Sequence, residues 1–182
     1  MNLPARILAL HGAFDAADVA HAFGGAIALA YWTENPRGTS DIDVNVFLPA
    51  AECEPALHAL PPGVRWSEDD RAVIERDGQR RLWWEDTPVD LFFDYHQVHA
   101  SAAAHRRYVT FAGTEIPILG PTELAIFKVM FDRTRDWADI EEMARNGTLD
   151  AQAVRGGVAE MAGDDDPRLS RIDDALERAS MG

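Results

Sequence analysis

The sequence predicts an α/β fold, or α+β by a stricter naming, with a small mixed sheet flanked by helices and a helical C-terminal lobe. Residues 41–48 alternate between polar and apolar side chains, which is the period of a strand with one buried face. Residues 89–95 show a similar pattern, and apolar residues recur at helical spacing after residue 120. We therefore expect a core over residues 1–119 and a helical lobe over residues 120–182 that packs on it.

The first elements are predicted from cap and turn residues. We expect a helix over residues 15–22, begun by an aspartate in the N-cap position. The Gly24-Gly25 pair then indicates the end of a strand, a tight turn and the start of a second helix. Proline and glycine predict a loop over residues 34–38, where Arg37 either touches phosphate or acceptor or is simply solvated.

The remaining elements follow from hydrophobic periodicity and from proline and glycine breaks. The two strands over residues 81–85 and 89–95 are consecutive, and a hairpin follows them. In chain order we predict helices over 50–60 and 67–75, strands over 81–85 and 89–95, a hairpin of 108–111 with 115–119, and helices over 121–132, 136–145, 149–161 and 167–179.

Composition excludes several classes of protein. At 182 residues, of which 47% are hydrophobic, the chain is long enough to bury a sizeable core. It contains no apolar run long enough to span a membrane, and its first residues do not resemble a signal peptide, so we expect a cytoplasmic protein with no membrane partner. Because Cys53 is the only cysteine, an internal disulfide and a cysteine-rich zinc site are both excluded.

The formal net charge of −14 bears on the choice of partner. Proteins that bind nucleic acid draw most of their affinity from clustered lysine and arginine, so this balance argues against DNA or RNA. It favours a small or cationic acceptor, or a cognate protein. The alternative is a local basic groove around Arg76, Arg80, Arg81, Arg106 and Arg107.

Three carboxylates are predicted to converge on one face of the sheet. Asp41 and Asp43 point the same way along the first strand, and Asp90 lies with Asp94 on one face of the second. If the two strands are neighbours, Asp41, Asp43 and Asp90 repel one another unless cations neutralise them. Oxygen-only ligands with open positions suit Mg²⁺ bridged to substrate phosphates, so these three residues are the expected metal ligands and catalytic residues.

A phosphate site is predicted beside these carboxylates. Gly24 and Gly25 let the backbone approach an anion, and the free N–H groups at the start of the following helix favour phosphate. Thr39 and Ser40, directly ahead of Asp41, could add hydroxyl contacts. A glycine pair alone is typical of a turn, but its order relative to the carboxylates makes the joint signal specific.

The order of Gly24-Gly25, Asp41-x-Asp43 and the later Asp90 resembles the signature of the DNA polymerase β-like nucleotidyltransferase superfamily. The long gap between the glycines and the first carboxylate is similar to the GG-type branch. The resemblance implies the nucleotidyltransferase fold, a nucleoside triphosphate such as ATP as co-substrate, and two Mg²⁺ ions.

Residues 118–128 and 135–140 resemble the helical tail of AbiEii-type and related bacterial members. Lys128 is the only lysine beside sixteen arginines, and the resemblance implies that its ammonium reaches the triphosphate. The alternative is an ion pair with Asp132. Asp136 is implied as a further member of the site, although acidic residues are also enriched in the first turn of helices for structural reasons.

Two further clusters have competing interpretations. His96 and His99 could share a helical face and bind a transition metal, but without an acidic or cysteine ligand a solvated face is the favoured interpretation. Trp83 and Trp84 face opposite sides of a strand, so that one belongs to the core. The other could stack on a base or sugar, although a second buried face is favoured.

The predicted function is Mg²⁺-dependent transfer of a nucleoside monophosphate from a nucleoside triphosphate to an acceptor. The excess of acidic residues favours a small molecule as this acceptor. One alternative is a non-catalytic nucleotide-binding or toxin–antitoxin interaction module. Another is a toxin-type enzyme that modifies RNA or protein. The presence of all three carboxylates favours an enzyme.

Overall fold

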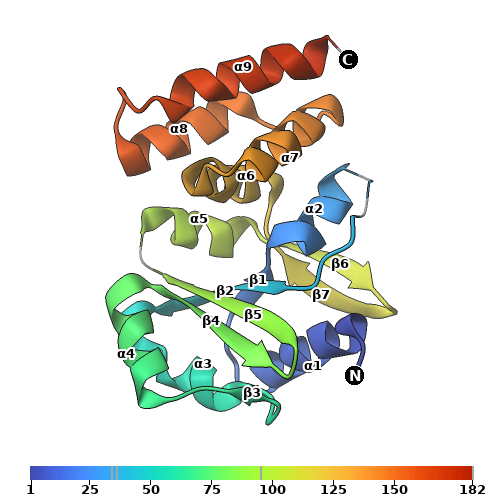
Figure 1. Ribbon diagram of the computed structural model, residues 1–182, viewed down its shortest axis with the longest axis vertical. Coiled ribbons are helices and arrows are strands. Elements are labelled where there is room, and N and C mark those ends of the chain that lie inside the picture. The colour runs from blue at the N-terminus through green and yellow to red at the C-terminus, as the bar shows by residue number, and fades with distance from the viewer. Residues whose placement is uncertain (34, 36, 95, 182) are drawn as a thin grey trace. The chain divides into compact units, whose positions relative to one another are not determined.

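The computed structural model describes residues 1–33, 35, 37–94 and 96–181 (Figure 1). The chain forms two compact units, one comprising residues 1–27 and 38–119 and the other residues 28–37 and 120–182. Of the predicted loop over residues 34–38, Glu34 and Pro36 lie outside the described residues, as does Tyr95 at the end of the second predicted strand. None of the described helices is long and apolar enough to cross a membrane.

The first unit is built on a mixed sheet, which confirms the predicted fold class. Within the described residues its seven strands follow the order β3-β4-β5-β2-β1-β7-β6. β2 runs antiparallel to β1 and parallel to β5, and β1 also runs parallel to β7. The strands span His21–Phe23 (β1), Ile42–Pro49 (β2), Val64–Arg65 (β3), Gln79–Trp84 (β4), Thr87–Asp94 (β5), Arg107–Phe111 (β6) and Thr114–Ile118 (β7).

Helices cover both faces of this sheet. Figure 1 shows α1, α3 and α4 on one side and α5 on the other. Residues at alternate positions along β5 are buried, while those between them are half-buried. The helices are α1 (Leu3–Ala16), α3 (Glu54–Ala59), α4 (Glu68–Asp77) and α5 (Gln97–His105), with a short 3₁₀ turn, η1 (Ala50–Glu52), and the start of α2 (Gly25–Thr33).

The predicted helix over residues 15–22 is wrong. The first helix is α1, which begins after Asn2, whose side chain accepts a hydrogen bond from the Ala5 N–H at 3.0 Å. Residues 21–23 form β1 instead, because their backbone pairs with residues 44–46 of β2. Long-range pairing with a strand more than twenty residues away therefore overrides the local preference of this alanine-rich segment.

The predicted helix over residues 50–60 is interrupted at Cys53, where η1 ends and α3 begins. Pro55 lies in the first turn of α3, and in a continuous helix it would lack the N–H that bonds to the preceding turn. The helix predicted over residues 67–75 is confirmed as α4, with Ser67 in a capping box with Asp70. Gly78 ends this helix with a φ of 70°.

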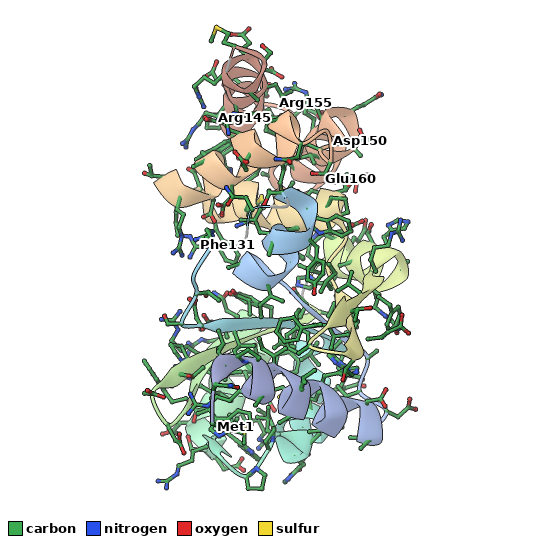
Figure 2. All side chains as sticks on the ribbon, turned by 90° about the vertical axis from the view of Figure 1, so that its right-hand side faces the viewer. Met1, Phe131, Arg145, Asp150, Arg155 and Glu160 are labelled. Atoms are coloured by element: carbon green, nitrogen blue, oxygen red, sulfur yellow. The ribbon has the colours of Figure 1, made fainter. Side chains whose placement is uncertain are left out.

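The second unit contains α6 (Pro121–Phe131), α7 (Thr134–Arg145), α8 (Ala151–Ala162) and α9 (Arg168–Ser180), together with most of α2. These bounds confirm the four predicted C-terminal helices. Its core contains Leu124, Ile140, Met143, Val154, Val158 and Ile172. Charged side chains such as Arg145 and Arg155 lie on the helix surfaces (Figure 2). Arg155 joins α8 to α9 through its ion pair with Asp173 at 2.8 Å.

Candidate functional site

Asp43 and Asp90 lie side by side in the sheet of the first unit. β2 and β5 are parallel neighbours, and their register pairs Asp43 directly with Asp90. Both side chains are half-buried and lie on the same face, while the neighbouring Ile42 and Val89 are fully buried on the other. The condition for convergence, that the two carboxylate-bearing strands are neighbours, is therefore met.

Asp41 lies just before β2, two residues ahead of Asp43. Its side chain is held by Thr39, whose hydroxyl donates to Asp41 Oδ1 at 2.5 Å. The Thr39 hydroxyl, which we expected to contact phosphate, is thus engaged with a carboxylate in this structure. Ser40 is exposed between these two residues.

The glycine pair brings the start of α2 against Asp43. The Gly24 N–H donates to the Asp43 carbonyl at 2.9 Å, and α2 begins at Gly25. Gly25 has a φ of 50°, and a β-carbon there would overlap the Asp43 carboxylate. At Gly24 a β-carbon would lie only 3.0 Å from Asn45 Nδ2. Glycine is required because the backbone carrying the free N–H groups of a helix N-terminus passes within contact of the carboxylate.

Arg81 on β4 supplies the charge that opposes this acidic cluster. Its Nε donates to Asp90 Oδ1 at 2.8 Å and its Nη2 to Asp90 Oδ2 at 2.7 Å. The same Nη2 lies 3.9 Å from Asp41 Oδ2. The hydrogen bonds to Asp90 raise the pKa of Arg81, and the charges of Asp90, Asp41 and Asp43 add to this effect. Arg81 is therefore a permanent cation in contact with two of the three carboxylates.

Arg81 was considered from the sequence only as part of a basic groove. Its partner could have been found from the hairpin, since antiparallel pairing of β4 with β5 places Arg81 opposite Asp90. Opposite charges facing each other across two strands are a recognised stabilising pair. The signal is weak in sequence alone, because the register of the hairpin must be known to within one residue.

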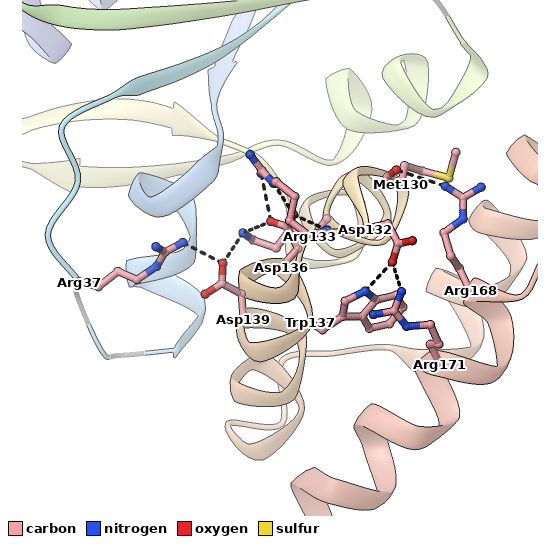
Figure 3. A network of polar contacts seen from close by, with 10 residues as sticks. Arg37, Met130, Asp132, Arg133, Asp136, Trp137, Asp139, Arg168 and Arg171 are labelled. Atoms are coloured by element: carbon pink, nitrogen blue, oxygen red, sulfur yellow. Dashed lines mark hydrogen bonds and ion pairs between the residues drawn. The ribbon is translucent and has the colours of Figure 1, made fainter.

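Lys128 is buried in an ion-pair network of the second unit. Figure 3 labels its partners Asp136 and Asp139 together with Arg37 and Arg133. Its Nζ lies 2.6 Å from Asp139 Oδ2 and 3.6 Å from Asp136 Oδ1, and the residue is only 4% exposed. Arg37 reaches the same Asp139 oxygen at 2.8 Å. Arg133 donates to Asp136 Oδ2 through its Nε at 2.6 Å. Three cations, Lys128, Arg37 and Arg133, thus bind these two carboxylates.

The alternative partner considered for Lys128, Asp132, has a different role. Its carboxylate accepts from Trp137 Nε1 at 2.7 Å and from Arg171, which ties α6 to α7 and α9 (Figure 3). Asp136 also accepts from the Arg133 N–H at 3.3 Å, so it caps the start of α7 as acidic residues commonly do. Asp139 is the central residue of the network, because both Lys128 and Arg37 bind it.

The fold is similar to that of solved proteins of low sequence identity. The chain matches the antibiotic-resistance factor ANT(2'')-Ia with a TM-score of 0.56 and 14% identity, over 98% of this chain and 97% of that one. The chain has the nucleotidyltransferase fold. No protein-family model matches the sequence, and no curated protein matches it.

Two further solved structures are less similar. A nucleotidyltransferase-like protein from Paracoccidioides brasiliensis matches with a TM-score of 0.45 and 14% identity, over 94% of this chain and 89% of that one. JHP933 from Helicobacter pylori matches with a TM-score of 0.47 and 14% identity, over 97% and 88% of the two chains.

The carboxylates of this nucleotidyltransferase fold have the donor chemistry that a hard divalent cation requires. Asp43 and Asp90 are register partners, Asp41 is close by, and all three offer oxygen atoms only. Among the described residues, no group of three His, Cys, Asp or Glu side chains is arranged to hold a metal ion as the structure stands. The Arg81 guanidinium provides a positive charge between Asp90 and Asp41.

The histidines and tryptophans lie outside this cluster of three carboxylates. His99 is buried on α5, and its Nδ1 bonds to the His96 carbonyl at 3.2 Å. The interpretation favoured from the sequence, that this face is solvated, is therefore wrong for His99. Trp84 is buried in the core, whereas Trp83 is 51% exposed. The expectation that both faces of this strand are buried is therefore wrong. Trp83 lies two residues from Arg81 on the same open face of β4.

Proposed function

We propose that this protein is a Mg²⁺-dependent nucleotidyltransferase that moves a nucleoside monophosphate from a nucleoside triphosphate to a small-molecule acceptor. The observation that carries the proposal is the register pairing of Asp43 with Asp90, with the Gly25 backbone in contact with Asp43. Carboxylates and the N-terminus of a helix are thereby brought to one place. Metal-bound triphosphate needs both, because it presents cations and anionic oxygens together.

In the proposed reaction, an acceptor hydroxyl or amine attacks the α-phosphorus, the new bond to phosphorus forms, and pyrophosphate leaves. Asp41 and Asp43 would hold the two Mg²⁺ ions, and Asp90 would complete the second site. When bound, these ions stabilise charge on the entering and leaving oxygens. Asp90 would also accept the proton that the acceptor loses.

The remaining predicted residues have supporting roles in this proposal. Gly24, Gly25 and Ser40 would position the β- and γ-phosphates, with Thr39 holding Asp41 in place. Lys128 would bind the triphosphate, as the resemblance of residues 118–128 to bacterial nucleotidyltransferases implies. Asp136 would act indirectly, by orienting Lys128 and Arg133.

A small cationic acceptor is the substrate class that the charge favours. The chain carries a net charge of −14, and acidic clefts steer cationic ligands while repelling nucleic-acid backbones. The fold match with an antibiotic-resistance factor supports a small molecule by analogy of fold.

A second candidate is a non-catalytic nucleotide-binding or interaction module, such as half of a toxin–antitoxin pair. One observation favours it: Arg81 already satisfies both oxygens of Asp90, as a structural ion pair would. A toxin-type enzyme that modifies RNA or protein would use the same carboxylates, but its macromolecular acceptor would need a basic groove or a docking face.

Thermal shift with ATP, GTP, CTP and UTP, each with and without Mg²⁺, tests the proposal. Ligands that bind only the native state raise the melting temperature. We expect a metal-dependent rise with at least one nucleotide in the wild type, lost in Asp43→Asn. Asp94→Asn is the matched control, because Asp94 lies four residues from Asp90 on the same face of β5.

The same proteins should then be assayed for pyrophosphate release with candidate acceptors. We expect Asp43→Asn to retain less than about 1% of wild-type transfer, since a metal ligand is lost from the reacting centre. Wild-type transfer by Asp43→Asn would eliminate the proposed mechanism. No thermal shift with any nucleotide would instead favour the interaction module.

A further inference from the structure

Arg81 occupies the position in which a cation would neutralise Asp90 and Asp41. Its guanidinium uses both oxygens of Asp90, and its Nη2 lies between Asp90, at 2.7 Å, and Asp41, at 3.9 Å. We infer that Arg81 is an internal counter-ion that competes with the divalent cation, so that metal binding requires Arg81 to release Asp90. This inference rests on the proposed function, because it concerns the same carboxylates.

The register of the hairpin places Arg81 beside Asp90. β4 and β5 are antiparallel, with Arg81 directly opposite Asp90 and Leu82 opposite Val89. Alternation along β4 buries Leu82 and Trp84 on the core side, which leaves Arg81 on the face that carries the carboxylates. The position of Arg81 therefore follows from the same register that positions Asp90.

The charges explain why a counter-ion is needed here. Asp41, Asp43 and Asp90 together carry three negative charges when ionised, and such groups repel one another at short range. Two parallel, charge-assisted bonds from Arg81 to Asp90 offset part of this repulsion. A divalent cation would offset more of it, but it would also repel the guanidinium from the same few ångströms of space.

Arg81 is able to leave without disturbing the core. Its side chain is 52% exposed, whereas that of Asp90 is 14% exposed. Rotation of the long arginine side chain would move the guanidinium into solvent while Leu82 and Trp84 stay packed on the opposite face. The carboxylates would remain where the sheet holds them, and only the cation beside them would be exchanged.

The opposing possibility is that Arg81 anchors Asp90 in the orientation that binds metal. The two roles predict opposite effects of removing the guanidinium. If Arg81 competes with the metal, removing its guanidinium leaves the carboxylates more available, and the affinity for metal rises. An anchor, once removed, lets Asp90 move and metal affinity falls.

Titration of Mg²⁺ and Mn²⁺ into the nucleotide-free protein, followed by calorimetry and by thermal shift, separates these roles. We expect Arg81→Gln to bind either ion about tenfold more tightly than the wild type, because a positive charge in contact with the same carboxylates is removed. Without metal this variant should melt at a lower temperature than the wild type, and the rise on adding Mg²⁺ should be larger. If the role of Arg81 were purely structural, Arg81→Gln would lower the melting temperature by the same amount with and without Mg²⁺.

Two variants complete the test. Arg80→Gln is the matched control, because Arg80 is adjacent on β4 but pairs with Asp70 at 2.6 Å, and its metal affinity should equal that of the wild type. Arg81→Lys keeps the charge without the bidentate geometry and should bind metal with intermediate affinity. If Arg81→Gln does not fold without metal, the metal affinity of Arg81→Lys is compared with that of the wild type instead.

The outcomes distinguish this inference from the proposed function. If Arg81→Gln and Arg81→Lys bind metal no more tightly than the wild type, Arg81 is not a competitor, although the proposed function survives as long as Asp43→Asn abolishes binding. If neither the wild type nor the Arg81 variants bind Mg²⁺ or Mn²⁺ without nucleotide, Arg81 is not what limits metal binding and this inference falls. The proposed function is then decided by the thermal shift with nucleotide and Mg²⁺ together, because Mg²⁺ is commonly held by carboxylates and substrate phosphates jointly.

Discussion

Gly25 and Asp43 are in direct contact, and the Asp43 carboxylate occupies the space where a β-carbon at position 25 would lie. Gly25 also has a φ of 50°, which L-residues other than glycine adopt at a cost. The glycine therefore has two independent reasons to be there, one steric and one conformational. Both depend on the start of α2 reaching the carboxylate.

The first prediction concerns this contact. Gly25→Ala should lower the free energy of unfolding by about 2–3 kcal/mol, because it combines an unfavourable φ with overlap of a carboxylate. Gly12→Ala, in the exposed part of α1 with open space around it, should raise stability by up to about 1 kcal/mol. Urea unfolding of both variants measures the difference. Equal effects of the two substitutions would mean that Gly25 does not approach Asp43 as described.

A second prediction contrasts two cations that share Asp136. Lys128→Ala should cost about 3 kcal/mol of stability, because Lys128 is buried and its loss leaves two buried carboxylates with fewer partners. Arg133→Ala should cost less than about 1 kcal/mol, since the Arg133 side chain is 57% exposed and solvent screens its ion pair. Denaturant midpoints at constant m-value test this ranking, and a larger effect at Arg133 would refute it.

A third prediction follows from His21, a buried residue of β1. Burial is the main cause that lowers its pKa to about 4, and the nearby His11 contributes, while the hydrogen bond to the Val19 carbonyl acts in the opposite direction. The folded protein thus disfavours the charged imidazolium. The unfolded chain binds this proton first as the pH falls, so His21 destabilises the fold progressively between about pH 6.5 and pH 4.

The size of this effect is set by the shift in pKa. Over that range His21 should account for a loss of about 3 kcal/mol in the free energy of unfolding, with no further loss below pH 4. The free energy of unfolding is measured at pH 7, 5.5 and 4 in the wild type and in His21→Gln. The difference between the two proteins at each pH gives the contribution of His21. The same slope in both proteins would show that other groups cause the acid sensitivity.

A fourth prediction separates the two adjacent tryptophans of β4. Trp84→Ala should cost about 3–5 kcal/mol, because Trp84 is buried and packs so closely on Gly63 that no β-carbon fits there. Trp83→Ala should change stability by less than about 1 kcal/mol, because half of Trp83 is exposed. Thermal or urea unfolding ranks the pair. If the two losses are similar, the face of β4 that carries Arg81 is not open.

The sequence predicted those elements whose pattern is local. The strands that carry Asp43 and Asp90, the strand-turn-helix at Gly24-Gly25 and the four C-terminal helices all appear close to their expected bounds. Each is recognisable from alternation, from helical spacing or from glycine and proline within about a dozen residues. The start of the first strand, which fell inside the helix predicted over residues 15–22, and the break at Cys53 were missed, because pairing with β2 and the missing N–H of Pro55 outweigh local propensity.

By itself the sequence determined which residues are able to carry charge, and on which side of its strand each one lies. Alternation places Asp41 and Asp43 on one face, and composition makes Lys128 the only lysine, without any knowledge of the fold. Only the tertiary structure decided which charges meet. Arg81 binds Asp90 because two strands pair in one register, and Lys128 binds Asp139 because two helices pack together. Ion pairs act over a few ångströms, so they depend on contacts between elements rather than on the period within one.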